Sequence, residues 1–224
     1  MLRRCFRPRG HDPSATSFGD HPVVTPDSVG PAIICDVGGV LLEDGMRTLL
    51  PQWAEASGLT AQDVVSRYRS SGLRDALWTG GISTETFWSR LSQALDFDLG
   101  TPAHLDQLMI DACSPLPAIA TLQSVHHRLW LATNHRAEWV IPALRRTDLG
   151  IGADRIVCSS LTGSCKPMRS FYEHVDSVVG DAARRPFVYI DDQAANLEPA
   201  AELGWRTVLL DSGSSTLMEQ ILLH

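Results

Sequence analysis

The stretch from Ile33 to Leu42 reads IICDVGGVLL. Its apolar start is typical of a strand that is buried on both faces. Asp36 ends this apolar run, and the two glycines that follow let the backbone of a tight loop approach a ligand closely. A carboxylate at the carboxyl end of a central strand is well placed to act as a nucleophile or to bind a metal ion. The stretch therefore predicts a buried strand that delivers Asp36 into a ligand-binding loop.

Length, charge and cysteine usage limit the kind of protein. With 224 residues, the chain can form one large domain or a core with a modest insertion. Its net charge of -7 argues against a nucleic-acid partner, and no apolar stretch approaches the roughly 18 residues of a membrane span. The five cysteines form no C-x-x-C pair, as expected of reduced thiols. We expect a cytoplasmic monomer or homodimer that acts on a small molecule, without nucleic-acid or membrane partners.

The chain divides into three parts. Residues 1–30 are rich in Arg, Pro, Ser, His and Gly, which predicts a disordered leader. Residues 31–43 and 114–224 alternate strand and helix patterns, which predicts an α/β core with a parallel sheet and crossover helices. The predicted strands are Ala32–Asp36, Arg128–Thr133, Arg155–Ser159, Phe187–Asp191 and Arg206–Leu210. Residues 44–113 show only amphipathic helix patterns, so we expect a small helical insert after the first strand.

Polar residues lie at or just beyond the ends of several predicted strands. They are Asp36, Thr133, Asn134, Lys166, Asp191 and Asp192. Because the carboxyl ends of parallel strands share one edge of a sheet, we expect these residues to converge there. They supply a carboxylate nucleophile, a hydroxyl and an amide for phosphate oxygens, a lysine to neutralise charge, and acids to hold a divalent cation. This combination predicts phosphoryl transfer.

Four segments, DVGGV, LATN, SCKP and YIDDQAAN, resemble in this order the four motifs of the haloacid dehalogenase (HAD) superfamily. The resemblance covers nearly everything after the leader. The helical insert is similar to the small C1-type cap of the family, and the D-x-G form of the first motif resembles the sugar-phosphate and glucose-1-phosphate phosphatase branch. The resemblance implies a Rossmann-like core, dependence on Mg²⁺ and an aspartyl-phosphate intermediate.

The resemblance also implies roles for individual residues. Asp36 matches the nucleophile and a magnesium ligand, and the backbone carbonyl of Gly38 matches a second ligand from the same loop. Thr133 matches the hydroxyl that binds phosphate, with Asn134 beside it as a further substrate-binding residue. Lys166 matches the lysine that offsets charge between the nucleophile and the phosphate.

The paired acids match the fourth motif of the family. Asp192 would be the direct carboxylate ligand of the metal ion and Asp191 a nearer or water-mediated partner, although the sequence leaves open which is which. Asn196, one helical turn beyond Asp192, either supports the metal site or bonds to the loop. Magnesium prefers oxygen ligands and retains waters, so two carboxylates, a carbonyl and a substrate phosphate suffice.

One position departs from the pattern of the family. Most phosphatases of this superfamily have a second aspartate two residues after the nucleophile, where it serves as general acid and then as general base. Here that residue is Gly38. General acid–base help is typically worth roughly 10² to 10⁴ in rate. We therefore expect slow turnover, a restriction to good leaving groups, or replacement of the missing group by Asp44, Glu43 or His135.

Two other functions stay open beside that of a Mg²⁺-dependent phosphatase of a small phosphorylated metabolite such as a sugar phosphate. The first is a phosphate-binding or scaffold protein without catalytic activity, which the glycine at position 38 favours and the otherwise full set of site residues disfavours. The second is haloacid dehalogenation, which uses the same aspartate nucleophile on carbon. The resemblance implies that such relatives need no metal and lack the paired acids seen here as Asp191 and Asp192.

Overall fold

The computed structural model describes residues 30–180 and 186–210. All of the predicted leader except Gly30 lies outside the described residues, as does the end of the predicted core from residue 211 onward.

Five parallel strands form one sheet in the order β3-β2-β1-β4-β5. The strands are β1 (Ile33–Cys35), β2 (Leu129–Thr133), β3 (Ile156–Cys158), β4 (Val188–Asp191) and β5 (Arg206–Leu209). Every predicted strand is present, within one residue at either end. The strand that carries Asp36 is the central one, and all of its side chains are buried. The prediction of an α/β core with a parallel sheet is confirmed.

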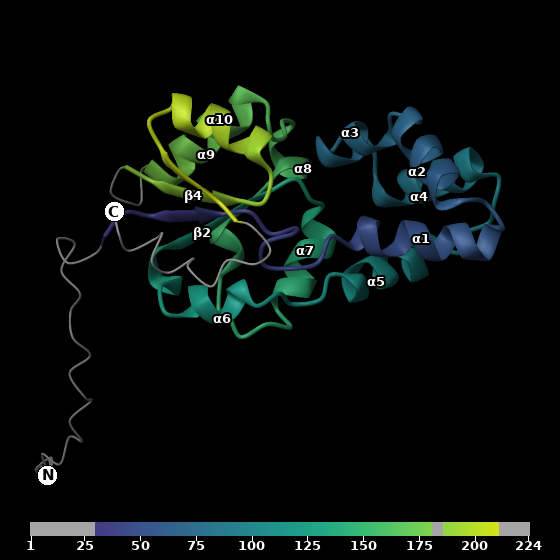
Figure 1. Cartoon of the computed structure of the whole chain (residues 1–224), viewed down its shortest axis with the longest axis horizontal. Helices are drawn as coiled ribbons and strands as arrows, with labels where there is room; N and C mark the ends of the chain where they lie inside the picture. Colours follow the sequence, from purple (N-terminus) through teal and green to yellow (C-terminus); the bar gives the residue numbers. More distant parts are fainter. Residues whose placement is uncertain (1–29, 181–185, 211–224) are drawn as a thin grey trace, which may run out of the picture.

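Helices cover both faces of the sheet (Figure 1). The helices and 3₁₀ turns of the core are α6 (Ala118–Gln123), η2 (His126–Arg128), α7 (Ala137–Leu144), η3 (Ala153–Arg155), α8 (Ser159–Thr162), α9 (Arg169–Gly180) and α10 (Ala194–Glu202). Since side chains alternate along a strand, Ile33 and Cys35 join the apolar cluster that contains α6 and α7. Ile34 points the other way, into the cluster built from α9 and α10. No helix of the described chain is long and apolar enough to cross a membrane.

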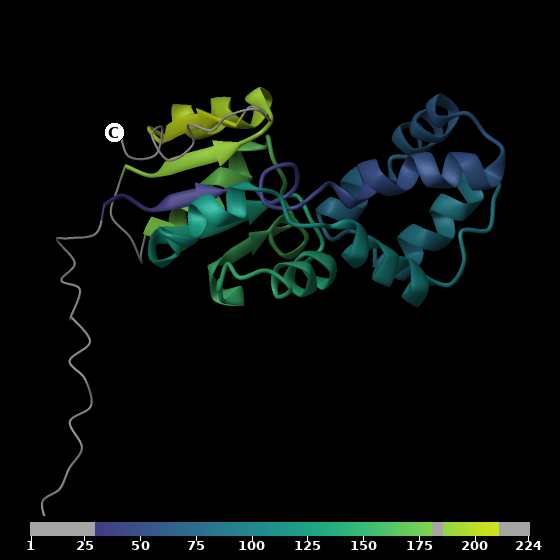
Figure 2. The same cartoon turned by 60° about the horizontal axis from the view of Figure 1, so that its bottom comes forward.

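Five further helices lie between β1 and β2 and form a lobe at one end of the core (Figure 2). They are α1 (Gly45–Ser57), α2 (Ala61–Ser70), α3 (Leu73–Trp78), α4 (Thr84–Leu95) and α5 (Pro102–Ala112). The helical insert after the first strand is therefore confirmed, and we call it the cap. Where the chain enters and leaves the cap, the two passing segments bond to each other. Glu43 N donates to Ser114 O at 2.8 Å, and Leu116 N donates to Leu41 O at 2.8 Å.

The cap also contacts the core away from this double crossing. Asp106 on α5 accepts the indole N–H groups of Trp88 on α4 and of Trp139 on α7, each at 2.7 Å. At the end of α3, the carbonyl oxygen of Trp78 accepts a hydrogen bond from Ser159 Oγ of the core at 2.6 Å. Buried side chains of the cap and of the α7 face belong to one continuous apolar cluster. These contacts hold the cap over the carboxyl edge of the sheet.

Candidate active site

Asp36 follows β1 directly and is 5% exposed. Its backbone N–H donates to Ile190 O of β4 at 2.9 Å, which continues the ladder by one residue and fixes the direction of the side chain. Carboxylate oxygen Oδ1 accepts from Val37 N at 2.6 Å and contacts Lys166 Nζ at 2.7 Å. Among the described residues, no donor reaches the second oxygen, Oδ2, which leaves it available for chemistry.

Lys166 is buried between two carboxylates, 2.7 Å from Asp36 Oδ1 and 2.8 Å from Asp191 Oδ2. The loop that carries the lysine is fixed by Asn134. The side-chain oxygen of Asn134 accepts from Lys166 N at 2.8 Å, and its Nδ2 donates to Lys166 O at 2.8 Å. The sequence predicts that Asn134 binds substrate, and here two of its polar atoms hold the lysine in place.

Asp191 is fully buried and surrounded by donors. Besides Lys166 Nζ, it accepts from Gln193 N at 2.9 Å and from Asn196 Nδ2 at 2.9 and 3.1 Å, and it also accepts from the hydroxyl of Tyr189. Sequence reasoning missed Tyr189. The alternation of side chains along a strand contained the signal, because residues two apart point to the same face.

Asp192 differs sharply from its neighbour. Its oxygen Oδ1 is buried and has no hydrogen-bond partner. The other oxygen lies against the loop after Asp36, since a Cβ atom on Gly39 would come within 2.4 Å of Asp192 Oδ2. Gly39 also has a φ of +82°, a conformation that residues with a side chain rarely adopt. The glycine lets the loop pass close beside the Asp192 carboxylate.

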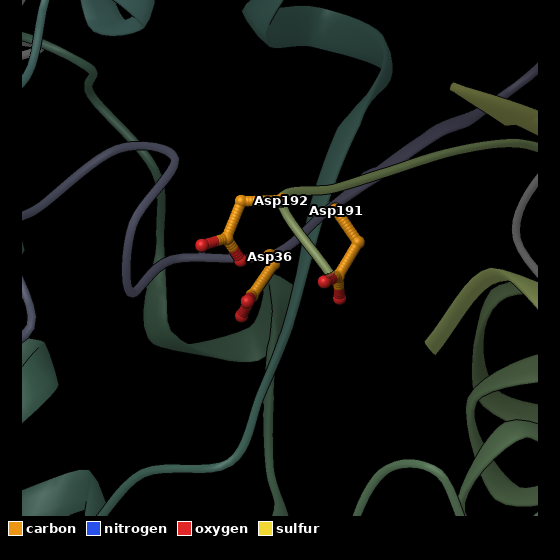
Figure 3. A group of neighbouring side chains, drawn as sticks. All are labelled: Asp36, Asp191 and Asp192. Carbon is orange, nitrogen blue, oxygen red and sulfur yellow. The ribbon is translucent and has the colours of Figure 1, made fainter. Parts of the chain in front are cut away.

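The three aspartates together form a group that fits a divalent cation (Figure 3). Each of Asp36, Asp191 and Asp192 offers an oxygen, and these oxygens lie within 4.8 Å of one another. Carboxylate oxygens are the ligands that Mg²⁺ prefers. A buried carboxylate oxygen without a partner is unfavourable, and a bound cation would satisfy the orphaned Asp192 Oδ1.

Negative charge exceeds positive charge at the site, because three carboxylates lie close together and the buried Lys166 ammonium contacts two of them. Burial raises the pKa of Asp36 to about 6, although the adjacent Lys166 opposes this shift. Burial by itself would lower the pKa of Lys166, but the two carboxylates beside it raise that pKa above its usual value. The pKa of Asp192 is raised by burial and by the charge of Asp191. A cation at the three aspartates would offset this excess of negative charge.

The other predicted residues also lie at the carboxyl edge of the sheet. Thr133 is the last residue of β2, is buried, and pairs with Cys158 of β3. Gly38 lies in the loop after Asp36, and no atom lies within 4 Å of where its Cβ would be. The loop therefore faces open space at Gly38.

The three candidates for the missing acid–base group have different surroundings. Glu43 is exposed at the entrance to the cap. Asp44 caps α1, where its Oδ1 accepts from Met46 N at 3.0 Å and Arg47 N at 3.2 Å. His135 has a buried Nδ1 without a partner, and its Nε2 lies 3.9 Å from Cys113 Sγ. Burial lowers the pKa of His135, and the carboxylate of Asp44 opposes that shift.

Comparison with known proteins finds similarity in structure alone. No protein-family model matches the chain, and no curated protein matches it. A predicted HAD-like family hydrolase from Porphyromonas gingivalis is similar in structure, with a TM-score of 0.67 and 22% identity over 85% of this chain and 96% of the other. A HAD family enzyme from Bacteroides thetaiotaomicron, solved with magnesium and inorganic phosphate, also has a TM-score of 0.67, with 16% identity over 84% of this chain and 97% of the other.

A structure described as a dehalogenase is similar as well, with a TM-score of 0.57 and 22% identity over 83% of this chain and 86% of the other. At these identities the likeness concerns the fold, which phosphate-binding and dehalogenating proteins share. The parallel sheet, the inserted helical cap and the acidic edge thus give this chain the fold of the HAD-like hydrolases.

Proposed function

We propose that this chain is a Mg²⁺-dependent phosphatase that hydrolyses a small phosphorylated metabolite through an aspartyl-phosphate on Asp36. The observation that carries the proposal is the buried arrangement around Lys166. Its ammonium group contacts both Asp36 and Asp191, beside an Asp192 oxygen that has no partner. A nucleophile, a fixed positive charge and an unsatisfied cation ligand are what phosphoryl transfer needs from a protein.

Each residue of the site has its own role in this proposed reaction. Val37 N and Lys166 Nζ hold Oδ1 of Asp36, so Oδ2 is the oxygen that attacks phosphorus. Lys166 offsets the negative charge that nucleophile and phosphate bring together, and Asn134 keeps the lysine backbone in place. Thr133 presents its hydroxyl to a phosphate oxygen. Water then hydrolyses the phosphorylated carboxylate and releases phosphate.

The cation would be held by Asp36, Asp192 and the backbone carbonyl of Gly38. Asp191 has donors on both oxygens, so we assign it to orienting Lys166 and the loop, with at most a water-mediated contact to the cation. When bound, Mg²⁺ supplies positive charge that polarises the phosphoryl group and stabilises the charge of the transition state.

The cap and the related structures support a small phosphorylated metabolite as the substrate. The cap covers the carboxyl edge of the sheet and would exclude water around a small substrate. The Bacteroides enzyme of the same fold was solved with magnesium and inorganic phosphate. A phosphorylated sugar or similar metabolite fits this arrangement better than a macromolecule. Dehalogenation has a counterpart among the similar structures, but it gives no role to the unpartnered oxygen of Asp192.

The test measures phosphate release from a panel of sugar phosphates, nucleotides, phosphorylated acids and p-nitrophenyl phosphate, with Mg²⁺ and with a chelator. Asp36→Asn should reduce turnover by on the order of 10³-fold or more, because the nucleophile is lost. Asp148→Asn serves as the control, since Asp148 is exposed on the loop after α7.

Three results would contradict the proposal. Near-normal release by Asp36→Asn would exclude this nucleophile. Chloride release from 2-chloropropionate that a chelator does not affect would indicate a dehalogenase. Metal-dependent binding of phosphate without turnover of any compound would indicate a binding protein.

A further inference from the structure

Phosphate ester cleavage leaves a proton to be supplied. When the bond between phosphorus and the leaving oxygen breaks, its electron pair stays on that oxygen, and an alkoxide leaves slowly unless a proton arrives with it. At the floor of the site, Lys166 is held by two carboxylates and Asp191 accepts from several donors. Gly38 has no side chain. A group on the walls of the site could supply the proton that Gly38 cannot.

The described part of the chain has four buried side-chain atoms without a hydrogen-bond partner. They are Tyr68 Oη, His135 Nδ1, Arg136 Nε and Asp192 Oδ1. Buried polar atoms without partners are rare in native proteins and mark places where water, an ion or a ligand completes the structure. The Asp192 oxygen is explained by a cation, and the two terminal nitrogens of Arg136 bond to Ile82 O and to Glu138. The histidine and the tyrosine are left to be explained.

His135 lies where cap and core meet. It follows Thr133 and Asn134 directly, so it begins the loop after β2 at the same sheet edge as Asp36. Its ring lies edge-on to Trp139 of α7, with 5.8 Å between ring centroids, and its Nε2 faces the Cys113 thiol at the end of the cap. Among the described residues, the charged group that acts on this ring is Asp44, at the entrance to the cap.

Burial lowers the pKa of His135, and the charge of Asp44 and a backbone hydrogen bond with Arg136 oppose that shift. Burial raises the pKa of the Cys113 thiol to about 11, so the thiol stays protonated. The Tyr68 hydroxyl also keeps its proton, because burial raises its pKa far above neutrality. Histidine is the side chain whose ordinary pKa suits proton transfer under these conditions.

We propose that His135 carries the proton in both halves of the reaction. This inference rests on the proposed phosphatase function. In the first half, Asp36 Oδ2 bonds to phosphorus, the bond to the leaving oxygen breaks, and protonated His135 gives that oxygen a proton, so that an alcohol departs. In the second half, neutral His135 takes a proton from the attacking water, the bond between Asp36 and phosphorus breaks, and phosphate leaves.

The test compares two leaving groups. p-Nitrophenolate is stable without a proton, whereas the alkoxide of a sugar phosphate is not. For the sugar phosphate that the wild type hydrolyses fastest, His135→Ala should lower kcat by roughly 10² to 10⁴. For p-nitrophenyl phosphate, it should lower the rate constant of the phosphorylation step by less than about tenfold, because that step then needs no acid. Single-turnover kinetics measure this rate constant separately from the later hydrolysis of the phosphorylated enzyme.

Two further variants separate proton transfer from structure. His135→Asn keeps a polar side chain of similar shape close to the position of Nδ1 but cannot titrate, so it should lose as much activity as His135→Ala. His127→Asn is the control for loss of a histidine, since His127 is exposed at the opposite, amino-terminal edge of the sheet. Melting temperatures of all variants establish that they fold.

Each outcome decides the matter. Selective loss on the sugar phosphate in both His135 variants supports the proposal. Equal losses on both substrates, no loss on either, or normal activity of His135→Asn would overturn it and leave the phosphatase function standing. A wild type that cleaves p-nitrophenyl phosphate but no alkyl phosphate would also overturn it alone. A wild type without activity on any phosphate ester would overturn the proposed function, and this inference with it.

Discussion

The floor and the cap-facing side of the candidate site are built in opposite ways. The floor consists of Asp36, Lys166 and Asp191, and the protein itself supplies the partners of the lysine and of Asp191. By the cap-facing side we mean three buried atoms that have no hydrogen-bond partner within the described residues by distance and angle: Tyr68 Oη on α2, His135 Nδ1 after β2 and Asp192 Oδ1 after β4. The two sides differ in polar contacts, although both are closely surrounded by protein.

This difference indicates which part of the site is ready in advance and which part a ligand completes. A floor with fixed donors stabilises developing charge without having to reorganise. Buried atoms without partners lower the stability of the free protein. They are retained in proteins where binding supplies what folding does not. We therefore expect changes on the floor to lower stability and changes on the cap-facing side to alter binding.

The two adjacent aspartates give the sharpest contrast. Asp191→Asn removes the charge that Lys166, Asn196 and Gln193 surround, and breaking a buried pair in this way costs about 3 to 5 kcal/mol of unfolding free energy. Asp192→Asn should cost less than about 1 kcal/mol, because its buried oxygen has no partner to lose. Urea unfolding with a chelator present measures both values.

The response of the melting temperature to Mg²⁺ should rank the two variants the other way, with the larger loss in Asp192→Asn. The melting temperature of the wild type should rise with Mg²⁺ concentration, since a ligand that binds only the folded state stabilises it. Asp192→Asn should lose most of this rise, and Asp191→Asn should retain part of it. An equal Mg²⁺ response in Asp192→Asn and the wild type would show that Asp192 is not a ligand, and that floor and cap-facing side do not differ in this respect.

A smaller effect is expected from the charge of Asp36. Its pKa rises from the ordinary value of 3.8 to about 6 in the folded state, mainly through burial. The stability linked to this group is therefore fully present below pH 4 and is lost as the pH rises through about 6. Asp36→Asn does not titrate, so its stability relative to the wild type should increase by on the order of 2 kcal/mol between pH 4 and pH 7.

Unfolding at several pH values, with a chelator present, measures this difference. Adding Mg²⁺ should shrink it, because a cation favours the ionised carboxylate. Asp148→Asn is again the control, and its stability relative to the wild type should stay flat over the same range. A difference that falls from pH 4 to pH 7 would mean that Lys166 outweighs burial at Asp36.

The sequence predicted the sheet edge better than it predicted the contacts there. Apolar runs mark the strands, and the carboxyl ends of parallel strands share one edge, so Asp36, Thr133 and Asp191 were predicted to lie there. Local patterning therefore sufficed for the core and for the helical insert. The resemblance of four short motifs supplied the order of these residues and their expected chemistry.

The sequence could not show which polar atoms would find partners. Substrate binding by Asn134 stays a prediction, and the sequence did not show its two hydrogen bonds to the backbone of Lys166, a residue that folding alone brings near. The roles of Asp191 and Asp192 were left open because adjacent residues share a sequence context and differ only in what surrounds them. Such differences arise from packing between distant segments, which periodicity and spacing do not encode.

The smallest predicted effect is also the most direct test of the contrast between the two sides. Tyr68→Phe removes one buried hydroxyl without a partner and keeps the edge-on contact of the ring with Phe87. Leaving a buried polar group unsatisfied costs about 1 to 3 kcal/mol, so the variant should be about 1 kcal/mol more stable than the wild type in the absence of ligand. Tyr172→Phe makes the same chemical change where the hydroxyl donates to Asn196 O at 2.7 Å. That variant should lose about 1 kcal/mol of unfolding free energy.

Urea unfolding measures both changes in unfolding free energy. Opposite signs for the two Tyr→Phe variants would show that the missing partner causes the difference. The gain in Tyr68→Phe should disappear once a substrate analogue is bound, if the hydroxyl is there to meet a ligand, and a gain unaffected by such a ligand would place Tyr68 outside the site.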